Sequence, residues 1–276
     1  MTTTLRPDGP ERRTVDGARA RTYSVCVNSR PVGRVELTTD PRFGPTVGRI
    51  EGLAVDEGER RRGRGTVAAL AGEEVLRSWG CTRVEIAVPA DATYALRLAA
   101  SLGYVEGNRH LAKELDGARR ALPPGSVLRP LSEAGFGPWR EREREEFIAA
   151  LTDRGVPRDQ AEARESAALR EVLPQGLATP GTALLALDHD GRTVGCLLVR
   201  TLEPAWVLAV DVETAHRGRG HGRTLMLGAE NACLDAGTTT LGLNVFVANT
   251  PAVRLYESLG YRTVERYFAK TLDVFR

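Results

Sequence analysis

The stretch HRGRGHGR, residues 216–223, places three glycines and three arginines in eight positions, and a near copy, RRRGRGT, occupies residues 60–66. A strand-like apolar run precedes each stretch, and a run with helical apolar spacing follows it. Glycines lack the Cβ atoms that would keep successive backbone N–H groups from converging on one anion, and the start of a helix adds unsatisfied donors and a positive dipole end. The two stretches therefore fit two phosphate-binding loops, each between a strand and a helix. Taken alone, they fit tight turns with exposed arginines as well.

The two loops belong to a longer internal repeat. Residues 55–104 align with residues 212–261 at a constant offset of 157 without a gap, and about 18 of the roughly 50 pairs are identical. Self-similarity of this kind indicates duplicated structure. We therefore expect two related domains, residues 1–118 and 119–276, joined through the Gly/Pro-rich segment 116–126.

Each copy predicts the same order of elements: three strands, a helix, a strand, a second helix and a last strand. Apolar alternation and helical spacing give this order, with a terminal glycine closing each helix. The order is that of an α/β fold. Only the second copy has two charged helical stretches in front of its first hairpin, at 139–155 and 157–176, so the front of the first copy is predicted to be truncated.

Composition and charge exclude several classes of protein. With 42% apolar and 27% charged residues the chain is typical of a globular protein, and a net charge of +2 is too small to indicate a polyanion-binding protein. No apolar run approaches the length of a membrane span, and the start lacks a signal-peptide pattern. Four widely spaced cysteines without CxxC spacing indicate neither a disulfide framework nor a metal site. We expect a cytoplasmic protein without a membrane partner.

The second copy resembles the GNAT superfamily of acyl-coenzyme A-dependent N-acetyltransferases, in which a Q/R-x-x-G-x-G/A loop binds the coenzyme A pyrophosphate. The resemblance rests on VDVETAHRGRGHGRTLM, residues 210–226, and LGLNVFVANTPAVRLYESLGY, residues 241–261. It covers about residues 126–272, and the first copy resembles the same fold over about residues 19–115. It implies two GNAT-like domains, each a mixed, mainly antiparallel sheet flanked by helices. The implied co-substrate is acetyl-CoA or another acyl-CoA, with no metal.

The resemblance also implies which residues hold the co-substrate. The pyrophosphate would bind the loop and its helix start, formed by Arg217, Gly218, Arg219, Gly220, His221, Gly222 and Arg223. The amide of Val212, where the family's fourth strand bulges, would bond the thioester carbonyl, with Val210 beside it. Asn249 would bond the pantetheine arm. Tyr256 would protonate the departing thiolate, because a phenol with a pKa of about 10 can donate to the anion of a thiol with a pKa of about 8.5.

Two carboxylates are candidates for the base that takes a proton from the attacking amine. Asp211 and Glu213 flank Val212, and strand alternation turns both to the face opposite the Val212 side chain. Charge balance beside the loop arginines explains the two carboxylates equally well. His216 and His221 fit contact with the anion or solvent better than a role as base.

We expect only the second copy to be catalytic. Ala92 and Ala99 stand opposite Asn249 and Tyr256 in the repeat, so the first copy lacks both side chains that would touch the reacting end of the co-substrate. It keeps a possible second coenzyme A loop, which contains Arg60, Gly63, Arg64 and Gly65.

The leading functional hypothesis is acetyl transfer to a primary amine of a small molecule by direct attack in a ternary complex. An aminoacyl-tRNA-dependent transferase and a non-catalytic acyl-CoA sensor are alternatives on the same fold. The balanced charge argues against the first and against nucleic acid in general, and Tyr256 with Asn249 argues against the second. Trp139, Phe147 and Tyr267 are candidates for the acceptor wall. Both a monomer with an internal pseudo-dimer and a homodimer fit the sequence.

Overall fold

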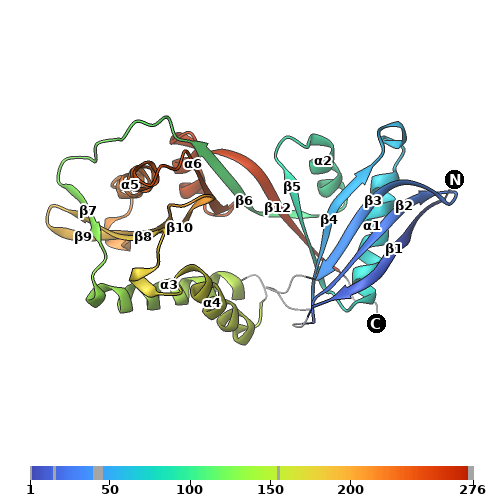
Figure 1. Ribbon diagram of the computed structural model, residues 1–276, viewed down its shortest axis with the longest axis horizontal. Coiled ribbons are helices and arrows are strands. Elements are labelled where there is room, and N and C mark those ends of the chain that lie inside the picture. The colour runs from blue at the N-terminus through green and yellow to red at the C-terminus, as the bar shows by residue number, and fades with distance from the viewer. Residues whose placement is uncertain (1, 15–16, 40–45, 154–155, 273–276) are drawn as a thin grey trace. The chain divides into compact units, whose positions relative to one another are not determined.

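The helices and strands follow one another in the order that the repeat predicts (Figure 1). The structure is a computed structural model that describes residues 2–14, 17–39, 46–153 and 156–272. The chain divides into unit 1, residues 1–109 with 264–276, and unit 2, residues 110–263. Each unit places helices against a mixed, mainly antiparallel arrangement of strands, which confirms the expected fold class.

Unit 1 holds the strands of the first half and one strand from the end of the chain. Its strands lie in the order β1 (Thr3–Arg13), β2 (Arg19–Val27), β3 (Arg30–Thr39), β4 (Val47–Val55), β5 (Arg83–Pro89) and β12 (Arg262–Thr271). The pair β4–β5 is parallel and the other pairs of neighbours are antiparallel. The turn η1 (Glu57–Glu59) and helix α1 (Arg64–Ser78) follow β4, and helix α2 (Thr93–Ser101) follows β5.

The sequence did not predict β1, because the leader contains Pro7 and Pro10. Proline cannot donate to a strand ladder, but it is tolerated on an edge strand. β1 is such an edge strand, since β2 is its sole neighbour in the strand order of the described residues.

Unit 2 contains most of the second half. Its strands lie in the order β6 (Val105–Glu114), β11 (Thr240–Phe246), β10 (Ala205–Val212), β9 (Arg192–Arg200), β8 (Thr182–His189) and β7 (Ser126–Pro130). The helical elements are α3 (Glu133–Thr152), α4 (Arg158–Val172), η2 (Gly176–Ala178), η3 (Thr214–His216), α5 (His221–Asp235) and α6 (Thr250–Ser258). α3 begins six residues before the expected start at 139, because Ser132 caps it by accepting a bond from the Gly135 amide at 3.3 Å. The expected end of this helix at residue 155 lies outside the described residues.

The last strand of each half lies in the unit of the other half. β12 pairs with β5 of unit 1, from Glu265 opposite Pro89 to Thr271 opposite Arg83. The end of β6, residues 110–114, belongs to unit 2, where β6 lies next to β11. The compact units therefore differ from the two sequence halves by these two exchanged strands.

Each of the two exchanged strands contains one of the two lysines of the chain. Lys113 in β6 donates to Glu230 of α5 at 2.7 Å, and Lys270 in β12 donates to Glu73 of α1 at the same distance. The glutamate side chains are only 5% and 4% exposed. Each ammonium also lies 5.6 Å from the centre of a buried tyrosine ring. Each half therefore supplies the cation that neutralises a buried carboxylate of the other half.

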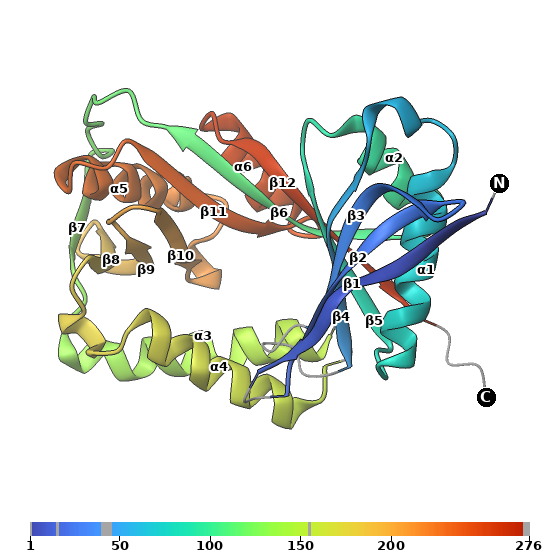
Figure 2. The same ribbon diagram turned by 45° about the vertical axis from the view of Figure 1, so that its right-hand side comes forward.

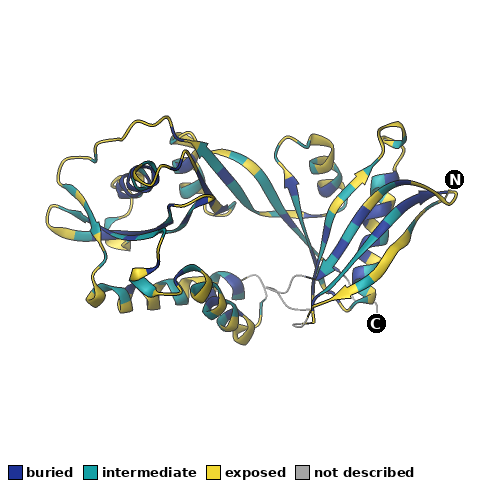
Figure 3. Cartoon of the chain, in the orientation of Figure 1, coloured by how far each residue is buried: buried dark blue, intermediate teal, exposed yellow. Residues whose placement is uncertain are grey.

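In unit 2, α5 and α3 cover opposite faces of the strands (Figure 2). Leu225 and Met226 of α5 are fully buried in one core, and Trp139 of α3 packs with Leu184 and Cys196 in the other. β9 lies between the two cores and is buried over six consecutive residues (Figure 3). A strand that is covered on both faces has a nearly continuous apolar sequence, as β9 does.

Candidate active site

The loop between β10 and α5 has the backbone conformation of an anion site. Gly218 and Gly220 adopt φ values of +77° and +88°, where residues with a Cβ are disfavoured. The Thr224 amide bonds the Gly220 carbonyl at 3.1 Å, so the amides of residues 221–223 have no partner within the helix. These donors and the positive end of α5 favour an anion at this place.

The arginine side chains of the loop make different contacts. The Arg217 Nε donates to the Val212 carbonyl at 2.9 Å, which ties the loop to the end of β10. Arg223 donates to the Ser258 hydroxyl at 2.6 Å, and Arg219 is exposed. Main-chain amides are therefore the main donors that the loop offers, with Arg219 adding positive charge.

The strands β10 and β11 separate beyond a short ladder. Their parallel pairing extends only from Ala205 opposite Leu241 to Val207 opposite Leu243. The Glu213 amide bonds the Val194 carbonyl of β9 at 3.0 Å, and because amides alternate along a strand, those of Val210 and Val212 point away from β9. The split between β10 and β11 thus receives two backbone donors.

The bulge expected at Val212 lies earlier in β10. The register against β9 shifts between Val207 and Ala209, whereas Val212 stands in register with Gly195. A Cβ at Gly195 would lie 2.4 Å from the Asp211 carbonyl oxygen, so the close approach of the two strands depends on this glycine.

Tyr256 lies on α6, and Asn249 is the residue directly before this helix. Tyr256 is 9% exposed and packs in the core that contains Val210 and Val212. Burial raises the pKa of Tyr256, which keeps it a protonated phenol, and its hydroxyl bonds none of the residues that the structure describes. Asn249 caps α6 by accepting a bond from the Ala252 amide at 3.2 Å, which leaves its side-chain NH₂ free to donate to a ligand.

The carboxylates Asp211 and Glu213 differ in their surroundings. Asp211 has an 11% exposed side chain, with Arg142 of α3 and Arg217 of the loop each 3.8 Å away. Glu213 is 48% exposed and lies 4.0 Å from His216. A third carboxylate, Glu143 of α3, was not singled out from the sequence, because alternating charges at 140–146 are typical of a solvated helix face. Burial and the nearby Glu146 and Asp211 raise the pKa of Glu143 to about 7.

His221 at the start of α5 is buried among histidines. Its ring centre lies 4.9 Å from that of His189 and 6.3 Å from that of His216. Burial, followed by these neighbouring rings and Arg219, lowers the pKa of His221, so its side chain is neutral near pH 7. His221 thus contributes its backbone amide rather than a positive charge to the loop.

Comparison with known proteins identifies the family of this chain. The profile described as Acetyltransferase (GNAT) family matches residues 3–104 and 138–261, which is more than half of the chain. The chain belongs to the GNAT acetyltransferase family. As the profile matches in both halves, the chain is a tandem GNAT protein, and the family makes it an acyl-CoA-dependent acetyltransferase.

Individual relatives of this GNAT protein support the tandem arrangement. Mycothiol acetyltransferase of Saccharomonospora viridis is 28% identical over 95% of this chain and 86% of its own length. A tandem GNAT protein from the clavulanic acid biosynthesis pathway is similar in structure, with a TM-score of 0.54, 21% identity and coverage of 94% of this chain and 85% of that one. A GCN5-related N-acetyltransferase from Sphaerobacter thermophilus has a TM-score of 0.60, 21% identity and coverage of 92% and 82%. At 21% identity these two structures show the fold alone.

Unit 1 repeats the backbone of the GNAT loop with different side chains. The Arg60 Nε donates to the Val55 carbonyl at 2.8 Å, as Arg217 does to Val212, and Gly63 has a φ of +72°. Arg64 is buried and donates to Glu59 at 2.7 Å. A second coenzyme A site in unit 1 stays a prediction.

The side chains near unit 1's second helix also differ from those of unit 2. Ala99, opposite Tyr256 in the repeat, is 2% exposed in the unit 1 core. Arg61 and Tyr94 bond to each other at 3.0 Å, whereas the corresponding positions in unit 2 are Gly218 and Pro251. The structure thus offers no phenol in unit 1 at the place that Tyr256 has in unit 2.

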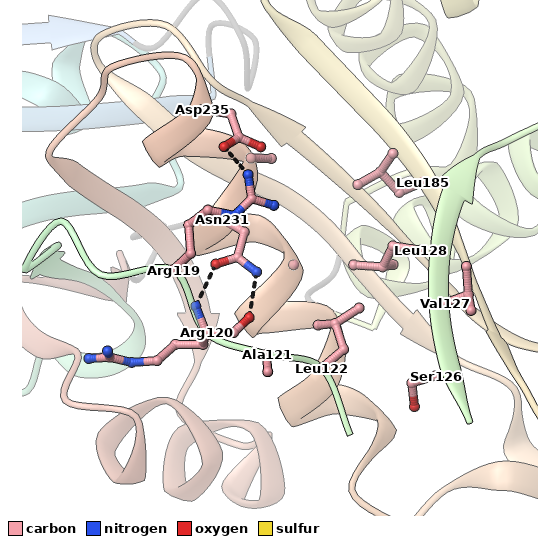
Figure 4. Close-up of a pocket in the computed structure, with 12 residues that line it drawn as sticks. Arg119, Arg120, Ala121, Leu122, Ser126, Val127, Leu128, Leu185, Asn231 and Asp235 are labelled. Carbon is pink, nitrogen blue, oxygen red and sulfur yellow. Dashed lines mark hydrogen bonds and ion pairs between the residues drawn. The ribbon is translucent and has the colours of Figure 1, made fainter. Parts of the chain in front are cut away.

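The residues expected to form an acceptor wall differ in exposure and belong to different units. Trp139 is 3% exposed in the core under α3, Phe147 is 41% exposed, and Tyr267 lies in β12 of unit 1, opposite Ala87. A hollow of about 540 Å³ in unit 2 lies instead between the linker and α5 (Figure 4). There the backbone of Arg120 exchanges two hydrogen bonds with the Asn231 side chain, at 2.9 and 2.8 Å. The residues that line this hollow do not include the glycine loop or Tyr256.

The described part of the chain lacks two further features. No helix in it is long and apolar enough to cross a membrane. Its histidines, cysteines and acidic residues nowhere form a group of three that could hold a metal ion. Its four cysteines are buried free thiols.

Proposed function

We propose that the chain transfers the acetyl group of acetyl-CoA to a primary amine of a small molecule in a ternary complex, and that unit 2 carries out the reaction in the cytoplasm. The observation that supports unit 2 is the Tyr256 hydroxyl, which has no partner among the described residues and belongs to a side chain packed with Val210 and Val212 of β10. Unit 1 has a similar loop but a buried alanine in that place.

The residues of unit 2 fit acetyl-CoA. The free amides at the start of α5 suit its pyrophosphate, and the amides of Val210 and Val212 suit a carbonyl placed in the split. Asn249 can donate to an amide carbonyl of the pantetheine arm. When bound, acetyl-CoA supplies an acetyl thioester, an acyl group already activated for attack.

The chain's own residues then have three tasks. The α5 loop fixes the position of the co-substrate, which turns a bimolecular reaction into one between held groups. The amides of Val210 and Val212 stabilise negative charge that develops on the carbonyl oxygen. Tyr256 holds a proton next to the sulfur position, and its raised pKa keeps that proton in place until a thiolate accepts it.

For the acceptor we propose only a chemical class, a primary amine of a small molecule. The full-length relative is called a mycothiol acetyltransferase, so its acceptor belongs in a panel with amino sugars, amino acids, polyamines and peptide N-termini. Asp211 already has Arg142 and Arg217 beside it. Glu143 and Glu213 lack an arginine partner among the described residues, so they suit an acceptor that arrives as a cation.

Titration calorimetry with acetyl-CoA, combined with thiol release against the amine panel, tests the proposal. We expect one panel member to be acetylated, and Tyr256→Phe to lower kcat by about 100-fold while acetyl-CoA binds as before. Tyr261→Phe is the matched control, because it removes a buried hydroxyl from the same core. Absence of acetyl-CoA binding, or equal turnover in Tyr256→Phe and wild type, would contradict the proposal.

A further inference from the structure

The end of β10 divides the candidate site into two faces. Val210 and Val212 pack with Tyr256 in one core, whereas Asp211 stands opposite Cys196, which belongs to the core under α3. The amides of the split lie between these two faces. Because the acid Tyr256 lies on the first face, we expect the attacking amine and its base on the second face, which α3 covers.

One carboxylate of α3 is turned toward this second face. Glu143 follows Trp139 by four residues, so the two share one side of the helix, and Trp139 is buried in the core beneath α3. The adjacent Arg142 comes within 3.8 Å of Asp211. This turn of α3 therefore lies against the end of β10, and Glu143 forms no ion pair with the residues that the structure describes.

The surroundings of Glu143 suit a group that takes up a proton near neutral pH. The charged groups that face it are Glu146 and Arg142 on its own helix and Asp211 on β10. Burial has the largest effect, the two carboxylates add to it and Arg142 opposes it, so that the pKa of Glu143 rises to about 7. A base with a pKa near the working pH combines the correct protonation state with a useful affinity for the proton.

The two carboxylates that the sequence singled out are placed differently. Asp211 lies between the guanidinium groups of Arg142 and Arg217, each 3.8 Å away, so its role is to hold the loop and α3 at the end of the strand. Glu213 is half exposed beside His216. Asp211 is partly buried but has arginine neighbours, and Glu213 is exposed, whereas Glu143 is partly buried and forms no ion pair with the described residues.

We infer that Glu143 is the base that accepts a proton from the attacking ammonium group, an inference that rests on the proposed function. The acceptor R–NH₃⁺ loses two protons as its nitrogen forms the N–C bond and the C–S bond of the thioester breaks. One proton passes to the Glu143 carboxylate and from there to solvent. The other replaces the proton that Tyr256 gives to the sulfur, so that the products are R–NH–acetyl, a free thiol and one released proton.

The first test is independent of activity. Carbon-13 NMR of the full chain labelled at the glutamate carboxyl carbons, recorded from pH 5 to 9, should show one glutamate that titrates at about pH 7. We expect this signal to disappear in Glu143→Gln. It should remain in Glu146→Gln, the matched variant three residues along the same helix, but titrate at a lower pH because one of the carboxylates that raise the pKa of Glu143 is gone. If every glutamate titrates below pH 6, the inference is wrong.

The second test is the pH profile of kcat/KM with the acceptor that the panel identifies. Glu143→Gln should lose about 100-fold together with the acid limb near pH 7, Glu143→Asp should recover part of the rate, and acetyl-CoA affinity should stay within about twofold. Circular dichroism confirms that the variants fold. Retention of the wild-type profile in Glu143→Gln, or a larger loss in Asp211→Asn with Glu143→Gln unaffected, would overturn the inference.

The outcomes separate the inference from the proposed function. A wild-type chain that acetylates an amine while Glu143→Gln is fully active refutes the base and leaves the transferase intact. A wild-type chain that binds no acetyl-CoA refutes the transferase and with it the role of Glu143, whatever the NMR titration shows.

Discussion

Lys113→Met removes the cation that the first half supplies to unit 2. The Glu230 side chain is 5% exposed and accepts from the Lys113 ammonium at 2.7 Å, so the substitution leaves a buried carboxylate without its partner. Removing one member of a buried pair costs about 3–5 kcal/mol. Lys113 itself is 22% exposed, and water that reaches this position lowers the cost. Protonation also limits it, since neutralising a glutamate of ordinary pKa at pH 7 costs roughly 4 kcal/mol.

We therefore expect Lys113→Met to lower the unfolding free energy of unit 2 by about 3 kcal/mol. That change is a large part of the roughly 5–15 kcal/mol typical of a domain. Tryptophan fluorescence during urea unfolding separates the units, because Trp79 lies in unit 1 and Trp139 and Trp206 lie in unit 2. In a Trp79→Phe background the signal reports unit 2 alone.

Lys270→Met is the matched control, since it should move the Trp79 transition instead. The double variant Lys113→Met/Glu230→Gln should recover most of the loss, because it leaves no unpaired charge. A shift below about 1 kcal/mol in unit 2, or a shift of the Trp79 transition in Lys113→Met, would refute the reasoning that the exchanged strand neutralises Glu230.

Three further predictions follow from the structure. The pKa of Glu143 is raised above the ordinary value, so the stabilisation by its neutral form is present below about pH 4.5 and is lost as the pH rises through about 7. Glu143→Gln should therefore be more stable than wild type by about 1–3 kcal/mol at pH 8.5. At pH 4.5 the two should have nearly equal unfolding free energies, as measured by urea unfolding. Gly220→Ala places a Cβ at a φ of +88° and should weaken acetyl-CoA binding at least about tenfold in calorimetry, whereas Gly63→Ala should leave the binding to unit 2 unchanged. A chain that stops at residue 261 lacks β12 and should lose the folded Trp79 signal of unit 1, and a Trp79 transition that survives this truncation would show that β12 is dispensable.

Most of the fold could be predicted from the repeat in the sequence. The offset of 157 residues and the two glycine loops were enough to predict the elements of both copies and the phosphate-binding backbone, because local spacing and glycine conformation set these features. The family resemblance then led to Tyr256 and Asn249, whose positions on and directly before α6 agree with the expected helix.

Three features escaped prediction for physical reasons. The strand exchange cannot be predicted from local sequence, because β6 and β12 are copies of one another. Lys113 and Lys270 could each pair with either glutamate. β1 was missed since its prolines are acceptable only at an edge, which is a property of the sheet. Glu143 was missed because its burial depends on how α3 packs under β9 and β10, and its own stretch of sequence looks uniformly solvated.

The exchanged strands also set the order in which the chain can mature during synthesis. A domain at the start of a chain usually folds while the remainder is still being made. Here the strand that completes unit 1, β12, comes after the residues of unit 2 in the chain. The N-terminal region must therefore wait, with the edge of β5 uncovered, until unit 2 and β12 have been translated. A pause or premature stop before β12 is made would harm the first-made part of the protein as much as unit 2.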